Sequence, residues 1–283
     1  MYSRCVRNSL RAIVTALIVV AAFGSGLAGD RPDRVLRVCA DPNNLPFSNH
    51  REEGFENKIA DLVAKDLSAQ LHYVWWAQRR GFVRNTLRAG ECDVLMGAPK
   101  GYELALTTMP YYRSAYVFVF RQSDGLHPRS LDDPVLRNVR LGVQMIGADF
   151  ANTPPAHAIT KRGITQNVIG YPVYGDYGSD APAAAIINAV ATREVDIALV
   201  WGPIAGYFTP RAPVPLTFAA IGAENDGPGI PLAFDICLAV RKGDTAFRDE
   251  LNSFIIRNRS AIDRILASYG VPTLPLPTKA EQP

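Results

Sequence analysis

The fold is decided by the stretch VLRVCADPNNLPF, which spans residues 35–47. Its first six residues form a hydrophobic run with strand character, and a loop that contains prolines and an aromatic residue follows. A helix is predicted after this loop, because apolar residues recur at helical spacing from Ile59 to Leu67. A strand, a loop and a helix in this order open an α/β unit.

The same order of elements continues to residue 96. A strand is predicted over 71–76, and a short helix over 82–87 ends at Gly90, because glycine is a common C-terminal cap. A third strand follows over 92–96. Units of this size form a parallel sheet through right-handed crossovers, so the sequence predicts an α/β fold.

A second cycle follows a β-rich run over 115–121. Apolar runs and helix-start prolines predict strands over 139–144, 168–171, 194–200 and 234–240, and helices over 156–161, 182–191 and 247–269. We place the crossing between the two halves at Gln122–Gly125. The last helix is predicted to return to the first half, and the proline-rich segment after Val271 is predicted to be loose.

The beginning of the chain is typical of a secretion signal. Three arginines precede an apolar stretch over 12–23, and small residues follow at 26–28. The apolar stretch is short for a membrane span, although a retained N-terminal anchor is the alternative. We therefore predict a periplasmic protein with a signal peptide over residues 1–28. The two cycles of strands and helices are predicted to form two lobes. Lobe 1 is formed by residues 29–122 and 233–283, and lobe 2 by residues 123–232.

Charge argues against two classes of partner. Removing the three arginines of the signal from the 30 basic residues leaves 27, against 27 acidic residues. A near-neutral mature chain gives no reason to expect nucleic acid or an anionic membrane as partner. With 48% hydrophobic and 20% charged residues, the chain can bury a hydrophobic core that does not need disulfides or metal ions to hold it together.

Three cysteines remain after export: Cys39, Cys92 and Cys237. Their spacing fits neither a zinc site nor a thioredoxin-type motif. A disulfide between Cys39 and Cys92 is one interpretation, because their strands are predicted to be neighbours in an oxidising compartment. An offset along the strands would separate the two sulfurs. In the other interpretation, the three cysteines are unpaired and act as small buried hydrophobic residues.

The residues give no support to catalysis. The four histidines are scattered, and the sequence has no Gly-x-Ser-x-Gly motif, phosphate-binding loop or dinucleotide fingerprint. Adjacent carboxylates such as Asp132 and Asp133 lie in turn-like contexts, where solvation is their simplest role. The sequence therefore predicts a protein that is not an enzyme and has no cofactor and no metal site.

Several motifs resemble those of type II periplasmic solute-binding proteins. They are GFE at 54–56 before a helix, LRAGECD at 87–93 before a strand, PYY at 110–112 and VRKGD at 240–244. The resemblance covers nearly the whole mature chain. It implies two doubly wound α/β lobes joined by two crossing segments, with a central cleft at the carboxyl ends of the strands.

A narrower resemblance rests on longer stretches. The runs CADPNNLPFSN at 39–49, RRGFVRNTL at 79–87, NTPPA at 152–156, YGDY at 174–177 and VWGP at 200–203 are similar to solute-binding-like proteins of the MoxJ/XoxJ type. These proteins are associated with quinoprotein (PQQ-dependent) methanol and alcohol dehydrogenases of the periplasm. The resemblance implies a protein that assists or activates the dehydrogenase rather than feeding a transporter.

The chain departs from amino-acid-binding members of this fold. Those members place an arginine after the third strand and an aspartate after the last strand of lobe 2. Here the corresponding runs are APKGYEL at 98–104 and WGP at 201–203. Leaving the charges of a zwitterion unpaired would cost several kcal/mol, so we do not expect an ordinary amino-acid ligand.

The cleft is expected to be lined by aromatic residues and few paired charges. Trp75 and Trp76 point to opposite faces of their strand, so one is expected in the core and the other near the cleft. Plain packing is the alternative for each aromatic residue, and a solvated surface for the arginine pair. The predicted cleft residues are Asp41, Asn44, Phe47, Trp76, Arg79, Arg80, Tyr102, Asp149, Tyr174, Asp176, Tyr177 and Trp201.

Two functions fit these observations. The first is an accessory protein whose cleft binds a PQQ-dependent dehydrogenase, its immature form or a related component. The second is a receptor of an ABC importer for PQQ or for an aromatic or alcohol-derived metabolite. An enzymatic role is the weakest alternative, because no catalytic constellation is present.

Overall fold

The computed structural model describes residues 34–146, 152–173, 178, 181–222 and 224–276. The predicted signal peptide and four predicted cleft residues, Asp149, Tyr174, Asp176 and Tyr177, lie outside this part of the chain. The described residues fall within one compact unit, 32–283. Among them, no helix is long and apolar enough to cross a membrane.

The first group of strands is built around β1 (Arg34–Ala40). It pairs in parallel with β4 (Ala69–Trp75) on one side and with β5 (Val94–Pro99) on the other, as predicted. Helix α1 (Phe55–Asp66) follows a small hairpin of β2 (Asn43–Asn44) and β3 (Ser48–Asn49), and a single helical turn, α2 (Phe82–Asn85), precedes β5.

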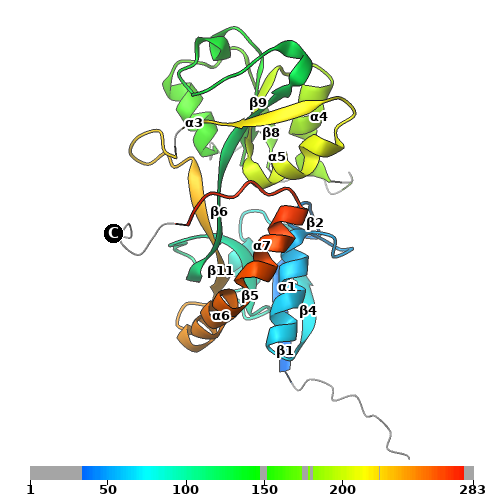
Figure 1. The fold of residues 1–283 in the computed structure, drawn as a ribbon. Coiled ribbons are helices and arrows are strands. Elements are labelled where there is room, and N and C mark those ends of the chain that lie inside the picture. The colour runs from blue at the N-terminus through cyan, green and yellow to red at the C-terminus, as the bar shows by residue number, and fades with distance from the viewer. Residues whose placement is uncertain (1–33, 147–151, 174–177, 179–180, 223, 277–283) are drawn as a thin grey trace, which may run out of the picture. The chain divides into compact units, whose positions relative to one another are not determined.

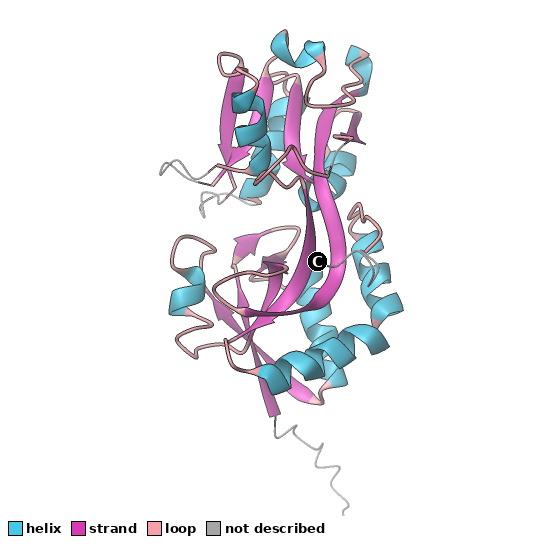
Figure 2. Cartoon of the chain, turned by 90° about the vertical axis from the view of Figure 1, so that its left-hand side faces the viewer, coloured by secondary structure: helices cyan, strands magenta, loops and turns pink. Residues whose placement is uncertain are grey.

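The second group of strands repeats this parallel arrangement. Strand β7 (Leu141–Met145) lies between β8 (Val168–Pro172) and β9 (Ile197–Trp201), and β10 (Leu216–Ala220) pairs elsewhere, antiparallel to β6. Figure 2 shows helices packed against the strands of both groups. Those of the second group are α3 (Pro154–Lys161), α4 (Ala185–Ala191) and α5 (Gly202–Phe208), with 3-10 turns at Gln122–Asp124, Pro134–Arg137, Pro182–Ala184 and Thr209–Arg211.

The two groups share one long strand, β6 (Leu106–Arg121) (Figure 1). Its residues 106–115 pair with β11 (Ala233–Val240), and its residues 116–120 pair with β9. The chain therefore changes group inside the strand, between Ala115 and Tyr116, and not at Gln122–Gly125 as we predicted. A continuous run of β-forming residues lets the strand cross without a loop.

The predicted last helix is two helices, α6 (Thr245–Arg257) and α7 (Arg259–Ser268). They are separated at Asn258, whose side-chain amide donates to the Asp66 carboxylate at 2.9 Å and to the Phe254 carbonyl at 3.1 Å. A side chain that hydrogen-bonds the backbone of the preceding turn favours a helix end. Both helices pack on β1 and α1 in one core cluster, so the return to the first group is observed.

The segment after Val271 is held more firmly than we predicted. The Ser114 hydroxyl donates to the Pro272 carbonyl at 2.6 Å, and the Leu274 amide donates to the Arg113 carbonyl at 2.9 Å. A Cβ added to Gly206 of α5 would lie 1.9 Å from the Gly270 carbonyl oxygen, so the backbones approach closely there. The proline-rich segment thus follows β6 at the place where the strand changes group.

Cys39 of β1 and Cys92, just before β5, form a disulfide with their Cα atoms 5.5 Å apart. Parallel pairing makes β1 and β5 neighbours, as predicted. The disulfide resolves the choice that the sequence left open for these two residues. Cys237 of β11 is a buried free thiol, and burial raises its pKa to about 12. For Cys237, the alternative interpretation from the sequence, an unpaired cysteine that packs as a small buried hydrophobic residue, is therefore the correct one.

The disulfide is expected to stabilise the first group of strands, because it closes a long loop between positions 53 residues apart. Replacing both cysteines (Cys39→Ala with Cys92→Ala) should lower the free energy of unfolding by about 2–4 kcal/mol in urea denaturation. Cys237→Ala is the matched control and should keep the disulfide. Dithiothreitol should lower the melting temperature of the wild type but not of the double variant; equal sensitivity would contradict the assignment.

Candidate binding site

Two adjoining cavities lie at the carboxyl ends of the parallel strands. The larger has a volume of about 930 Å³ and the smaller about 290 Å³, and both are lined by Gln78, Gly97 and Pro99. Each also receives residues from the second group of strands, such as Ile146 for the larger and Trp201 for the smaller. A shared wall of this kind makes them two parts of one cleft.

Asp41 organises the loops that form the cleft. Its buried carboxylate accepts hydrogen bonds from the amides of Asn43 at 2.8 Å and Gln78 at 2.6 Å, and its carbonyl accepts one from the Ser48 hydroxyl at 2.8 Å. Asp41 is not among the residues that line either cavity, so we correct its predicted role. It positions the loop after β1 against the loop after β4.

Asn44 and Phe47, both predicted, line the smaller cavity. The Asn44 side-chain amide donates to the Gln78 side-chain oxygen at 3.0 Å, so the two loops also meet at the cavity wall. A cis peptide bond between Leu45 and Pro46 lies between them, and the Phe47 ring contacts the buried Phe55 ring edge-on with centroids 5.3 Å apart.

Aromatic rings from both strand groups form another part of this wall. The Trp201 ring contacts Tyr116 at 5.2 Å and Phe234 at 5.8 Å between centroids, both edge-to-face. The Trp201 amide donates to the Gln144 side-chain oxygen at 2.8 Å. Trp201 was predicted from the run after the last strand, whereas Tyr116 and Phe234 were treated as strand residues only, because their inward face depends on the register of β6 and β11.

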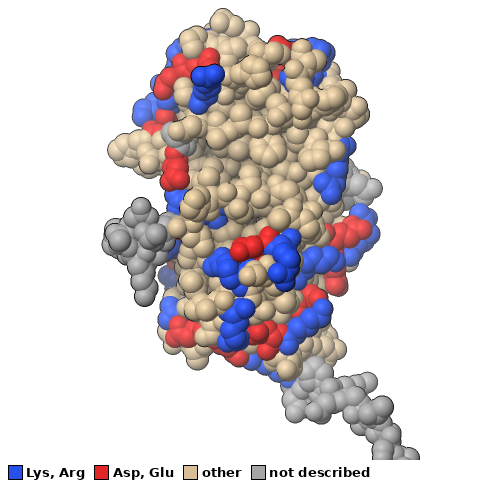
Figure 3. Space-filling view, in the orientation of Figure 1, with Lys and Arg blue, Asp and Glu red and all other residues tan. Residues whose placement is uncertain are grey.

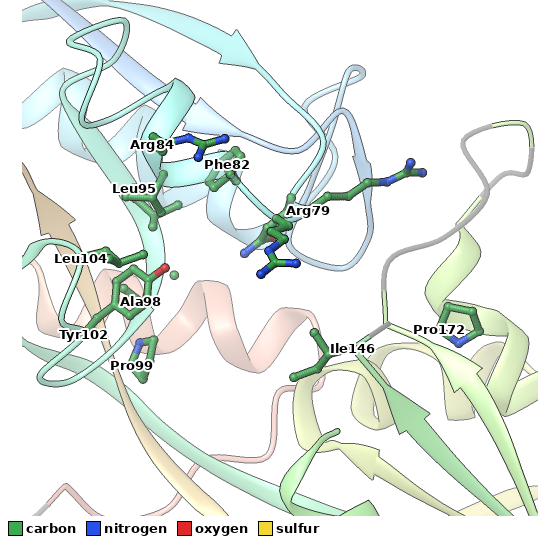
Figure 4. A pocket seen from close by; sticks show the side chains of 15 residues that line it. Arg79, Phe82, Arg84, Leu95, Ala98, Pro99, Tyr102, Leu104, Ile146 and Pro172 are labelled. Atoms are coloured by element: carbon green, nitrogen blue, oxygen red, sulfur yellow. The ribbon is translucent and has the colours of Figure 1, made fainter. Parts of the chain in front are cut away.

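Basic and apolar side chains together line the larger cavity, and Arg84 lies beside Phe82 and Leu95 (Figure 4). The predicted Arg79 and Arg80 line it together with Arg84. Burial raises the pKa of the predicted Tyr102, which lies across the same cavity. The apolar lining includes Leu104 and the 42% exposed Ile146, which lie apart in Figure 4 and which the sequence did not indicate.

Trp76 does not occupy the predicted place. Its side chain is 45% exposed, and it lines neither cavity. Trp75 faces the opposite way, packs against the core and stacks on Tyr73 with ring centroids 4.6 Å apart. The alternation of the two tryptophans is therefore observed, but the outer one lies on the surface rather than at the cavity wall.

Glu56 is a cavity residue that the sequence analysis missed. It lies in the first turn of α1 and reaches the smaller cavity beside Gly97, where an added Cβ would lie 2.3 Å from the Glu56 carboxyl oxygen Oε1. Burial, and then the nearby Asp41, raises the pKa of Glu56 to about 8. A helix N-terminus favours an anion by about 0.3–1 kcal/mol, which is less than this shift represents.

The signal for Glu56 was present but had an ordinary explanation. An acid in the first turn of a helix is common, because it complements the helix dipole. Only the close approach of Gly97 shows that the carboxyl points into the cleft. Among the described residues, no group of three or more histidine, cysteine or acidic side chains could hold a metal ion.

The fold agrees with comparisons to known proteins. The chain belongs to the bacterial extracellular solute-binding proteins, family 3, whose family model matches residues 36–271. The type II periplasmic binding protein fold predicted from the sequence is thereby confirmed.

Within this class the chain is similar to proteins of the MoxJ/XoxJ type, as its motifs indicated. It is 30% identical to protein MoxJ of Methylorubrum extorquens over 259 residues, which cover 87% of this chain and 84% of MoxJ. The crystal structure of MxaJ from Methlophaga aminisulfidivorans matches with a TM-score of 0.71 and 27% identity, covering 85% of this chain and all of MxaJ. The periplasmic binding protein XoxJ from Methylobacterium extorquens matches with a TM-score of 0.70 and 34% identity, covering 86% of this chain and all of XoxJ.

The raised pKa of Glu56 predicts a pH-dependent stability. Below about pH 4.5 this group's contribution to the free energy of unfolding is fully present, and it is lost as the pH rises through about 8, because the folded chain holds a proton that the unfolded chain releases. Glu56→Gln removes the titrating group, so this loss does not occur in the variant. From pH 5 to pH 9, the free energy of unfolding measured in urea should rise by about 1–3 kcal/mol in the variant relative to the wild type.

Glu91→Gln is the matched control, because Glu91 is exposed and lines neither cavity. Its stability should follow that of the wild type across the same range. Parallel curves for Glu56→Gln and the wild type would show that Glu56 is ionised in the folded protein.

Proposed function

We propose that this protein is a non-enzymatic periplasmic accessory protein of a PQQ-dependent methanol or alcohol dehydrogenase system. Its cleft and the rim of that cleft bind the dehydrogenase, its immature form or a related component and assist activation or maturation. The observation that carries the proposal is the similarity to MoxJ, MxaJ and XoxJ along nearly the whole described chain.

The chemistry of the cleft supports a guest other than a free amino acid. Strand β5 ends at Pro99 and β9 at Trp201, so neither strand end carries the arginine or aspartate that would hold a zwitterion. The described wall of the smaller cavity is mainly aromatic and apolar. Surfaces of this kind suit the buried anchor side chains of protein interfaces.

The rim of the larger cavity supports a protein partner in the same way. Leu104 and Ile146 line it and are 44% and 42% exposed, and Trp76 is exposed on the loop side of β4. Three arginines also line this cavity, so its wall offers both apolar and basic surface. On another face of the molecule, which Figure 3 shows, basic and acidic residues are interspersed. The exposed apolar side chains of the rim are expected to contribute most of the contact with a partner.

Substitution at this rim tests the proposal. Leu104→Asp and Ile146→Asp should each weaken binding of the purified dehydrogenase by about tenfold or more. Each substitution places a charge on a surface that the partner would cover, and this charge would lose its water on binding. Binding is measured with immobilised protein and the apo and holo dehydrogenase. Ile256→Asp is the control, since Ile256 is 66% exposed on α6 and lines neither cavity. Absence of association with either form would refute the accessory role.

The larger cavity favours a second candidate function, a receptor for PQQ or a related small molecule. Its volume of about 930 Å³ lies in the range of small-molecule sites, and three arginines line it. Arginine pairs carboxylates bidentately, and PQQ is a tricarboxylate. The inference is that this molecule would lie against Arg79, Arg80 and Arg84.

A thermal-shift measurement separates the two functions. If the cavity is a receptor site, PQQ at about 100 times its dissociation constant should stabilise the protein by about 2.7 kcal/mol and raise the melting temperature. Arg84→Gln should reduce the shift, whereas Arg88→Gln, which lies outside both cavities, should not. An unchanged melting temperature would exclude the receptor role for PQQ.

A further inference from the structure

The smaller cavity combines one carboxyl group with five aromatic rings. The carboxyl is that of Glu56, and the rings are those of Phe47, Tyr112, Tyr116, Trp201 and Phe234. Three of the rings form a continuous edge-to-face series, since Trp201 contacts both Tyr116 and Phe234. The volume of about 290 Å³ limits an occupant to a small group.

The amide side chains on the wall have partners, whereas the carboxyl has none within the part of the chain that the structure describes. Asn44 donates to Gln78 at 3.0 Å, and Gln144 accepts from the Trp201 amide at 2.8 Å. Among the described residues, no donor forms a hydrogen bond to the Glu56 carboxyl. Glu56 is partly exposed, so water in the cavity solvates its carboxyl, and a ligand that displaces this water must supply a hydrogen-bond donor in its place.

We propose that the smaller cavity binds a primary ammonium group carried on an apolar stem, with Glu56 as its anionic partner and the aromatic rings around it. The ammonium belongs either to a free monoamine or to a lysine side chain of a protein partner. The inference deepens the proposed function and rests on its assignment of the cleft as the binding site.

The charge and shape of the cavity select this ligand class. Aromatic faces attract a cation, and the attraction is larger when water is excluded. A carboxyl group repels an anion, and the arginines of the cleft line the larger cavity rather than this one. An amine without a carboxylate therefore meets a partner here, whereas a zwitterion would leave its carboxylate unpaired.

Binding is coupled to the release of a proton. The pKa of Glu56 is raised to about 8, so its carboxyl is mostly neutral near pH 7 and ionises when an ammonium pairs with it. Asp41 is the charged group that faces it, and Tyr73, Tyr111 and Tyr112 are neutral phenols whose pKa values burial raises. Affinity for an amine should rise about 50-fold between pH 6 and pH 8, as the ionised fraction rises.

Isothermal titration of the full mature chain tests the proposal with three probes: hexylamine, N-acetyl-lysine amide and the neutral isostere hexan-1-ol. Hexylamine should bind about tenfold or more tightly than hexan-1-ol. In buffers of different ionisation enthalpy, amine binding near pH 7 should release close to one proton. Binding of N-acetyl-lysine amide at least as tight as that of hexylamine assigns the site to a lysine side chain; binding of hexylamine alone assigns it to a free monoamine.

Glu56→Gln is the decisive variant, and it is expected to fold because the native group is mostly neutral near pH 7. It should lose the preference for hexylamine over hexan-1-ol and the proton release, while Glu91→Gln keeps both. Equal binding of amine and alcohol by the wild type, or unchanged amine binding by Glu56→Gln, would overturn the proposal. Capture of the dehydrogenase is measured without amine, so the accessory role can stand or fail separately.

Discussion

The backbone hydrogen bonds of β6 are the constraint on which the cleft depends. One unbroken strand pairs with β11 in the first group and with β9 in the second, so the two groups belong to one hydrogen-bonded sheet. Tyr112 and Tyr116, four residues apart on this strand, both line the smaller cavity. Residues four apart on a strand share a face, so the strand that joins the groups also supplies the rings of the site.

The loop after β1 provides the second requirement. Two backbone amides converge on the Asp41 carboxylate, and this fixes Asn44, Phe47 and Gln78 at the cavity wall. These hydrogen bonds satisfy both oxygens of the buried Asp41 side chain. Glu56 lies close by without such donors and is pushed toward its neutral form. Two neighbouring acids thus take different roles because only one of them is given hydrogen bonds.

The sequence predicted most elements of the fold, because apolar residues recur at different spacings in strands and in helices. The parallel order of β1, β4 and β5, the second cycle and the return of the last helices could all be read in this way. The break at Asn258 could not, because it depends on an amide reaching Asp66 of α1. The point of crossing was misplaced, because the strand pattern does not show which neighbour each part of β6 pairs with.

The candidate site was predictable in part for the same reason. Loops that follow strands were expected at the cleft, and Asn44, Phe47, Arg79, Arg80, Tyr102 and Trp201 line its cavities. Tyr116, Phe234 and Glu56 were not found, since their inward direction follows from register and from a close approach to Gly97. Asp41 and Trp76 lay in the right loops, but one is buried beneath the wall and the other lies on the surface.

The segment that follows α7 adds a consequence for motion. It is tied to Arg113 and Ser114, next to the point where β6 passes from one group to the other, and its backbone abuts α5 at Gly206. Any bending of the strand at this point would strain or detach the tail. The energy needed to open or shut the cleft would then include the energy of breaking the hydrogen bonds of Pro272 and Leu274, and a ligand that changes the bend would also shift these residues.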